Sequence, residues 1–532
     1  MPQLPENPSF EHLKKQAKDL LRLYQSNSPE AFDRFRKSLP VAAGKDDEAI
    51  AALGLKLHDA QSCIAREYGL PAWQNLRNYI DYCNSKLSNE RKDVIALWLH
   101  KAYGHDDQKE DPAAAAQGLQ QIPDFVQGDL HLACAIGDEE TVRRSIAADP
   151  SCVNRINSSW RCPGCKRDLG MPPLFAVTHT TLLRIPAFRG QLYRCARMLL
   201  DAGADPNQSW RDRDTDPLFS SLYGAAGKNH DAELTRMLLE SGANPADGES
   251  LYHSIETDDH TCMRLLLEAG ARVEGSNALH HQLDKDDIEG LRLLLQYTKD
   301  VNDPQSEIGR PLLWAIRRRR SPEHLKALLA AGADPKVKTK DGVSAYLFAV
   351  QFGLTEIALL LRDAGSEAVL SVEDQFLSAC ARVDRAEARR LLAAQPDIFS
   401  RMSEAQLRQL PNLTETRSND DAVRFMVELG WPISVRGGDW SASALNLAVF
   451  SGNAELTRFL LEHGSSWTER HGFEGDAGGI LGWASRNEPP GGDWVGCAKA
   501  LVDHGMPIPV KLDDYSQEVA AFFSEVRRLE NV

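Results

Sequence analysis

The stretch RCPGCKRDLG at residues 161–170 holds the one close pair of cysteines in the chain, Cys162 and Cys165. Two thiolates at this spacing can bind zinc, and His179 could supply a third ligand. A structural zinc site needs four ligands, however, and the sequence contains no second C-x-x-C. A redox pair would need a strand before it and a helix after it, and neither pattern is present. We therefore expect an inert loop and no cofactor, with metal binding and redox chemistry as the alternatives.

Four consecutive arginines at residues 317–320 end one apolar helical segment, and three lysines follow in the next loop. A guanidinium group binds a carboxylate or phosphate through two parallel hydrogen bonds. A charge run at a helix end is usually a solvated face near the negative end of the helix dipole, which is the first expectation here. The loop should project to the same side, so an anion-binding patch is the second hypothesis. Its members would be Arg317, Arg318, Lys336, Lys338 and Lys340.

Tryptophan and arginine recur in other loops of the chain. These two residue types dominate binding hot spots, so the loops are candidate contact sites for a protein partner. The alternative is that their aromatic side chains pack on a neighbouring segment, and both interpretations stay open. The candidates are Trp210, Arg211, Arg213, Trp431, Arg436, Trp440, Trp467 and Arg470.

No catalytic motif accompanies these residues. The sequence contains no H-E-x-x-H, no G-x-x-x-x-G-K-[ST] and no G-x-S-x-G, and its histidines are spread singly. We therefore expect a protein that is not an enzyme.

Composition narrows the class of partner. The 532-residue chain has a formal net charge of −15, so most of its surface should repel nucleic acid and anionic membranes. No 18-residue apolar run is present, and the start, MPQLPENPSFEHLKK, lacks the apolar segment of a signal peptide. The scattered cysteines mostly occupy apolar helical positions, which is typical of reduced thiols. We expect a cytoplasmic protein.

One short sequence motif recurs along the chain, and it indicates which structural elements carry the candidate residues. It reads MLLDAGADPN at 198–207, MLLESGANP at 237–245, LLLEAGARV at 265–273 and LLAAGADPK at 328–336. Each copy is an amphipathic helix that ends at a glycine, where positive φ is expected. The spacing is near 33 residues, which predicts a stack of helical hairpins. The glycines are Gly203, Gly242, Gly270, Gly332, Gly365, Gly430, Gly464 and Gly505.

A second helical pattern precedes each copy of this motif, as in LHLACAIG at 130–137 and LNLAVFSG at 445–452. The combined unit resembles the ankyrin repeat, and the resemblance covers residues 129–509 in about eleven units, with weak ones at 372–396 and 404–430. It implies an all-α ankyrin-repeat solenoid whose loop tips and inner helices form the recognition surface. It also implies that His131, His253 and His280 make structural hydrogen bonds.

The ends of the chain differ from this repeat. Residues 1–104 resemble an N-terminal helical block found on bacterial ankyrin-repeat proteins, and residues 105–124 look like a polar linker. The array should span residues 125–510, with an insertion near 155–170. Residues 511–532 should form a capping helix, because a terminal unit must replace an apolar face by a polar one.

Together these patterns predict a non-catalytic scaffold for protein–protein interaction in a bacterial cytoplasm. An unknown protein partner would bind the concave face and loop tips, while membrane association is not expected and nucleic-acid binding is disfavoured. The alternatives are anion or nucleic-acid binding at the Arg/Lys patch, and metal or redox chemistry at Cys162 and Cys165.

Overall fold

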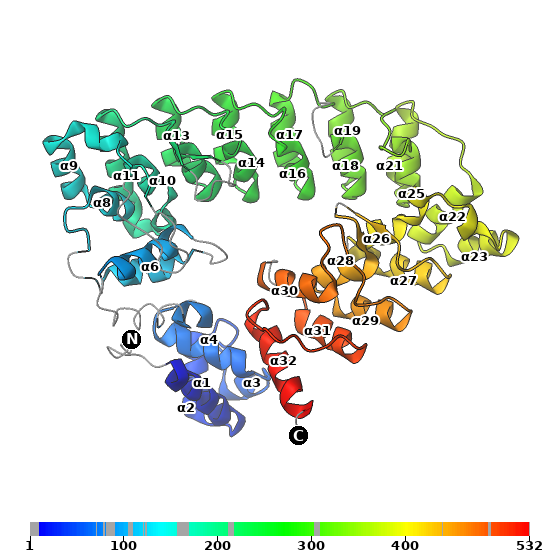
Figure 1. Ribbon diagram of the computed structural model, residues 1–532, viewed down its shortest axis with the longest axis horizontal. Helices are drawn as coiled ribbons and strands as arrows, with labels where there is room; N and C mark the ends of the chain where they lie inside the picture. Colours follow the sequence, from blue (N-terminus) through cyan, green and yellow to red (C-terminus); the bar gives the residue numbers. More distant parts are fainter. Residues whose placement is uncertain are drawn as a thin grey trace. The chain divides into compact units, whose positions relative to one another are not determined.

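The computed structural model divides the chain into two compact units, residues Met1–Arg272 and Val273–Val532 (Figure 1). Most described elements are α-helices, and the few strands are two residues long. The described residues are 10–70, 72–77, 80, 91–104, 110–120, 122, 125–156, 170–210, 218–302, 309–415, 417–438, 440–487 and 491–530.

The first unit consists of short helices and one short hairpin. Its α-helices are α1 (Phe10–Gln25), α2 (Pro29–Ser38), α3 (Asp47–Ala51), α4 (Leu57–Glu67), α6 (Arg91–Tyr103), α7 (Pro112–Leu119), α8 (Leu130–Ile136), α9 (Glu139–Ala148), α10 (Pro173–His179), α11 (Pro186–Asp201), α12 (Ser221–Tyr223), α13 (Ala232–Glu240), α14 (Ser250–His253) and α15 (Thr261–Glu268). Its strands β1 (Ser209–Trp210) and β2 (Phe219–Ser220) pair antiparallel.

The second unit repeats a pattern of paired helices. Its α-helices are α16 (Ala278–Asp284), α17 (Ile288–Tyr297), α18 (Pro311–Arg317), α19 (Pro322–Ala330), α20 (Ala345–Gln351), α21 (Thr355–Asp363), α22 (Val372–Ala381), α23 (Arg385–Ala394), α24 (Ile398–Arg401), α25 (Glu404–Leu407), α26 (Gln409–Thr414), α27 (Asp420–Glu428), α28 (Ala444–Phe450), α29 (Ala454–Glu462), α30 (Ala477–Asn487), α31 (Trp494–Asp503) and α32 (Gln517–Glu530). Strands β3 (Arg436–Gly437) and β4 (Ala442–Ser443) pair antiparallel.

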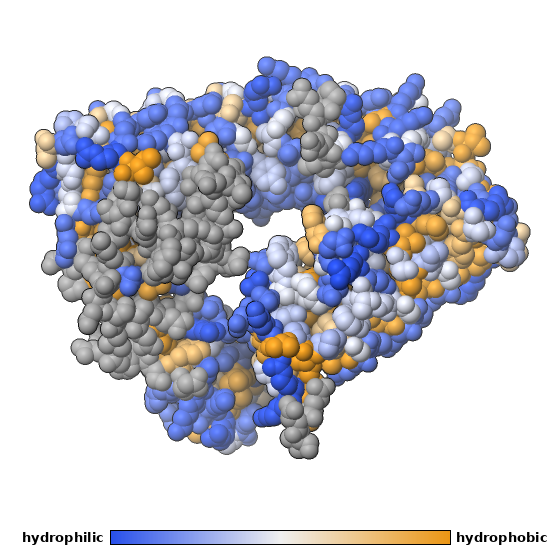
Figure 2. Space-filling model, viewed as in Figure 1, coloured by the Kyte–Doolittle hydropathy of each residue, from blue (hydrophilic) through white to orange (hydrophobic). Residues whose placement is uncertain are grey.

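Helices of successive pairs pack in two rows within the second unit. The first helices contact one another in the order α16, α18, α20 and α22, and again α26, α28 and α30. The second helices contact one another in the order α17, α19 and α21, and again α27, α29 and α31. Each pair therefore buries its apolar face against its neighbours, which is how a repeat too small for its own core is stabilised. The surface above α17 and α19 is mainly hydrophilic (Figure 2).

The repeated glycines adopt the backbone conformation that the sequence predicts. All eight have φ between 89° and 103°. At Gly270, with φ of 98°, no neighbour would touch an added Cβ, so the constraint there is the backbone conformation alone. These glycines end the second helices and turn the chain into the next loop.

Two of the three repeat histidines bond to the backbone of a following loop. His131 Nε2 lies 2.9 Å from the carbonyl oxygen of Arg155, and His280 Nε2 lies 2.8 Å from that of Gly309. His253 differs, because its ring contacts Glu256 at 2.7 Å and Glu249 at 3.3 Å. All three rings therefore make structural polar contacts, although only two share one geometry.

The segment expected to be a linker, residues 105–124, contains a helix. Residues Pro112–Leu119 form α7, Asp111 caps it by accepting a hydrogen bond from the Ala114 amide, and Ala114 and Ala115 are buried. The linker prediction is therefore wrong over α7. The reason is that an aspartate followed by proline is a good helix start, and four alanines favour a helix.

The C-terminal helix is shorter than residues 511–532. It forms α32, which packs on α31 and buries Val519 and Phe523, whereas Leu529 stays 65% exposed.

The described cysteines are free and buried. Burial raises the thiol pKa of several of them, as at Cys380, where it is raised to about 12. Among the described residues, no helix has the length and apolarity to cross a membrane.

Candidate functional site

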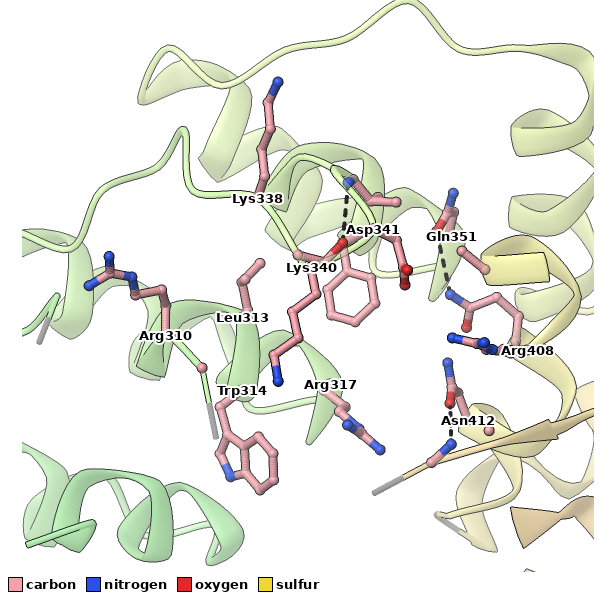
Figure 3. Close-up of a pocket in the computed structure, with 18 of the residues that line it drawn as sticks. Arg310, Leu313, Trp314, Arg317, Lys338, Lys340, Asp341, Gln351, Arg408 and Asn412 are labelled. Carbon is pink, nitrogen blue, oxygen red and sulfur yellow. Dashed lines mark hydrogen bonds between the residues drawn. The ribbon is translucent and has the colours of Figure 1, made fainter. Parts of the chain in front are cut away.

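A pocket of about 900 Å³ lies in the second unit (Figure 3). Four segments line it: helix α18 with the two residues before it, helix α20 with the loop before it, the short helices α25 and α26, and the β3–β4 hairpin. These segments are first helices and loop tips of different helix pairs. The repeat itself thus brings together side chains that are more than 90 residues apart in the sequence.

Local structure fixes each lining segment. Pro311 occupies the first position of α18, where its missing N–H leaves no hydrogen bond unmade. Lys338 pairs with Ser344 in an isolated antiparallel bridge, and the Ser344 hydroxyl accepts a hydrogen bond from the Leu347 amide to cap α20. In the other loop, Arg436 pairs with Ser443, whose hydroxyl caps α28. Each loop tip is therefore a short hairpin tied to the helix that follows it.

The lining is strongly cationic, although the chain as a whole is acidic. Asp341 is the one carboxylate among the described lining residues. Six lining residues carry a positive charge: Arg310, Arg317, Lys338, Lys340, Arg408 and Arg436. Walls of one sign raise the local potential and attract ligands of the opposite charge.

Arg317 is held in place by a carboxylate of the chain itself. Its Nη2 donates to Glu415 Oε1 at 2.8 Å, and Arg318 Nη1 approaches the other oxygen of Glu415 at 3.4 Å. Both guanidinium groups also lie over the ring of Trp314, at 5.6 and 4.4 Å from its centroid. The side chains of Arg317 and Glu415 are only 20% and 10% exposed, so the pair is well shielded from water.

The remaining arginines of the run have separate structural roles. Arg318 also contacts Asp284 at 2.7 Å, Arg319 donates to the carbonyl oxygen of Phe352 at 2.8 Å, and Arg320 donates to the Arg318 carbonyl. Burial lowers the pKa of Arg319 and of Arg320. The expected solvated charge face is therefore not formed, because the chain turns at Arg319, whose φ is 54°, and the four side chains diverge.

Two of the three predicted lysines belong to the pocket. Lys340 extends toward the same space as Arg317 and Arg408, whereas Lys338 extends away from it (Figure 3). Lys336 does not line the pocket, because it lies in the preceding turn, where its amide donates to Asp334 at 2.9 Å. Within the described part of the chain, the side chains of Lys338, Lys340 and Arg310 make no ion pair or hydrogen bond.

Buried amide side chains form a polar floor beneath the cations. Gln409 donates to Gln351 at 3.4 Å, and Gln351 donates to Asp374 at 3.0 Å. Asp374 also accepts from Gln406 at 2.8 Å and completes the capping box of α22. Nearer the hairpin, Asn412 Oδ1 accepts a hydrogen bond from the Gly438 amide at 3.0 Å. The floor is therefore tied to the start of one helix and to the hairpin.

The loop tryptophans pack on the protein. Trp431 is 3% exposed, its ring stacks with Phe376, and its Nε1 donates to the Leu407 carbonyl at 3.0 Å. Trp431 is thus a core residue, and the packing alternative describes it. Trp210 packs on Phe175 and is partly buried.

The other loop candidates lie in several different places. Trp440 packs on Phe450, and Trp467 packs at the edge of the core, both half-buried. Arg470 is exposed and donates to the Glu474 carbonyl at 3.0 Å. Of this group the pocket includes Arg436 alone, whose Nε donates to the Ser441 carbonyl at 2.9 Å. Arg211 and Arg213 lie outside the described residues.

The cysteine pair Cys162 and Cys165 also lies outside the described residues. His179, considered as a third zinc ligand, is buried in the first unit, where its ring stacks on Phe175 with centroids 3.4 Å apart. Burial, and then the charge of Lys228, holds the pKa of His179 well below its ordinary value. Among the described residues, no cluster of three His, Cys, Asp or Glu side chains could hold a metal ion.

Sequence reasoning missed two cations of the pocket, Arg310 and Arg408. Arg310 directly precedes the proline that starts α18. In the repeat pattern this position lies in the loop before the first helix of the unit. Arg408 lies between the short helices α25 and α26, in one of the two segments whose repeat signal is weak, so no periodic pattern marks the direction of its side chain. The first could have been found by aligning the units, whereas the second could not.

No protein-family model matches the chain, and no curated protein matches it. A solved structure that is similar to part of the chain is the crystal structure of the human ASB11 ankyrin repeat domain. The two chains are 22% identical, the match covers 43% of this chain and 98% of that chain, and the TM-score is 0.21.

Proposed function

We propose that the protein is a non-catalytic binding module that recognises a protein partner, with the basic pocket of the second unit as its main contact site. The observation that carries this proposal is the origin of the lining: first helices and loop tips of several units converge on one cavity. Those are the parts of the unit through which the ankyrin resemblance implies recognition. In this proposal residues 125–510 form an ankyrin array, preceded by the helical block at 1–104 and closed by α32.

The chemistry of the lining favours binding over catalysis. Arginine, lysine and amide side chains dominate it, and these groups hold anions by charge and hydrogen bonds. Among the described lining residues there is no histidine or cysteine, and Asp341 is the single carboxylate, so paired acid–base chemistry lacks its usual groups. A bacterial source remains part of the proposal and follows from the resemblance of residues 1–104. A cytoplasmic location is also part of it and follows from the scattered cysteines at apolar helical positions.

Affinity capture from a lysate of the source cells tests the proposal. The full chain is compared with the charge-reversal variant Lys340→Glu/Arg408→Glu. The matched control is Arg292→Glu/Lys326→Glu, which reverses two charges on exposed parts of α17 and α19. We expect a specific protein that the wild type and the control retain and the pocket variant loses. If all three chains retain the same proteins, the pocket is not the contact site.

A further inference from the structure

We propose that the pocket binds an acidic segment of the partner protein, a short stretch of chain that carries several Asp or Glu side chains. This inference rests on the proposed function and specifies the chemistry of the partner. It begins from the charges that the pocket leaves unpaired. Lys340, Lys338 and Arg310 have no carboxylate partner in the described part of the chain, so anions of a ligand can reach them.

The pocket already shows how it would hold a carboxylate. Glu415 lies against Arg317 and Arg318, with its two oxygens at 2.8 and 3.4 Å from their guanidinium nitrogens. Arg408 and Lys340 extend into the same space as Arg317 (Figure 3). The Nη2 of Arg408 donates to Glu404 Oε1 at 2.5 Å. Carboxylates of a ligand that enters this space can contact Lys340 and Arg408.

The size of the cavity favours a segment with several anionic groups over a single small ion. A volume of about 900 Å³ lies near the upper end of the range for ligand pockets. Arg310 lies at the left of the view and Lys338 at its top, both away from Arg317 and Arg408 (Figure 3). A chain of several residues can contact the central cations and these two outer cations at once, which a single small ion cannot do.

Nucleic acid fits the pocket less well than an acidic segment. Single-stranded nucleic acid needs aromatic faces on which its bases stack. The aromatic lining residues are Trp314 and Phe348, and Trp314 is 9% exposed with Arg318 over its ring. A long polyanion would also run onto the acidic remainder of a chain whose net charge is −15. A short acidic segment can place all of its negative charge inside the basic pocket and so avoids this repulsion.

Fluorescence anisotropy with the full chain tests the inference directly. The probe is a labelled decapeptide of alternating Glu and Asp, and the control probe replaces them with Gln and Asn. We expect the acidic probe to bind. Its affinity should fall strongly as the salt concentration rises from about 50 to about 300 mM, because the contacts are ionic. The variant Lys340→Gln/Arg408→Gln should bind it about tenfold more weakly. The control Arg292→Gln/Lys326→Gln should change the affinity less than about twofold.

A second variant keeps the test informative if loss of Arg408 disturbs the fold. Arg310→Gln/Lys338→Gln changes two side chains that make no ion pair among the described residues, so the fold should be unaffected. We expect it to weaken the acidic probe by about threefold.

Three results would overturn the inference: equal binding of the two probes, unchanged affinity of the Lys340/Arg408 variant, or tighter pocket-dependent binding of tripolyphosphate or a dT oligonucleotide. The capture experiment and the peptide experiment can fail independently of each other. Pocket-dependent capture without peptide binding would remove only the acidic-segment assignment. Peptide binding without pocket-dependent capture would remove the proposed function.

Discussion

Glu415 competes with any anionic ligand for the arginines of the pocket. Its carboxylate is 10% exposed and pairs with Arg317 and Arg318. The substitution Glu415→Gln keeps the shape and removes the charge, so the pocket becomes more cationic. We expect the acidic decapeptide to bind severalfold more tightly, while the free energy of unfolding falls by about 1–2 kcal/mol, because two partly buried guanidinium groups lose an ionic acceptor. Anisotropy and urea denaturation measure the two effects.

Higher peptide affinity together with lower stability distinguishes a carboxylate that competes with the ligand from one that only supports the fold. A supporting role alone would lower both stability and affinity. Glu387→Gln is the control, because Glu387 pairs with Arg390 on an exposed part of α23 outside the pocket. If Glu415→Gln weakens peptide binding, Glu415 builds the site and does not compete for it.

A glycine at a helix end supplies a second prediction for single residues. Gly270 has φ of 98°, a conformation that costs an alanine about 1–2 kcal/mol. Gly270→Ala should therefore lower the urea midpoint. Gly190 is an exposed glycine inside α11, where an added Cβ meets only the far end of Arg194 at 3.4 Å. Gly190→Ala should raise stability by about 0.5–1 kcal/mol. Equal effects of the two substitutions would contradict this reason for the repeated glycine.

Four of the six cations of the pocket could be predicted from the sequence. Arg317, Lys338, Lys340 and Arg436 were candidates because of their type and loop position. Their side-chain directions were not predictable. The turn at Arg319, where a non-glycine residue adopts φ of 54°, sends the arginines apart, and no periodic pattern marks such a turn.

Helices were easier to predict than the loops that join them. Spacing of 3.6 residues marks the buried face of a helix directly. The short hairpins β1–β2 and β3–β4 have only two residues per strand, too few for any alternation to appear in the sequence. The tips that build the pocket therefore belong to the part of the fold that sequence periodicity does not encode.

The last helix gives a prediction at the scale of elements. Helix α32 packs on α31, and its Phe523 is fully buried in the core of the second unit, whereas Leu529 on the same helix is 65% exposed. Phe523→Ala should cost about 3–5 kcal/mol locally and release α32. We expect faster amide hydrogen exchange in α32 and α31, because a stacked helix pair that loses its neighbour loses most of its burial. Leu529→Ala should leave the exchange unchanged. Slow exchange in α31 after Phe523→Ala would show that α31 does not depend on α32.

Buried histidines make the stability of the whole molecule sensitive to mild acid. Burial lowers the pKa of several rings, and His253 is the exception, because its contacts with Glu256 and Glu249 outweigh burial and raise its pKa. A lowered histidine pKa means that the unfolded chain binds more protons, so stability is full above the ordinary value and falls with pH below it. The rings with lowered pKa are His131, His179, His230, His324 and His471.

Thermal unfolding across pH measures this effect, and one ring isolates it. His179 is buried, and its Nε2 has no hydrogen-bond partner among the described residues, so burial strongly disfavours its protonated form. We expect Tm to fall as pH is lowered from about 7.5 to 5.5, through the ordinary histidine range. His179→Asn should make this fall shallower, whatever its effect on Tm at pH 7.5. His58→Asn, which changes an exposed ring, should leave the slope unchanged. A wild-type slope retained by His179→Asn would show that this ring is not the source of the acid sensitivity.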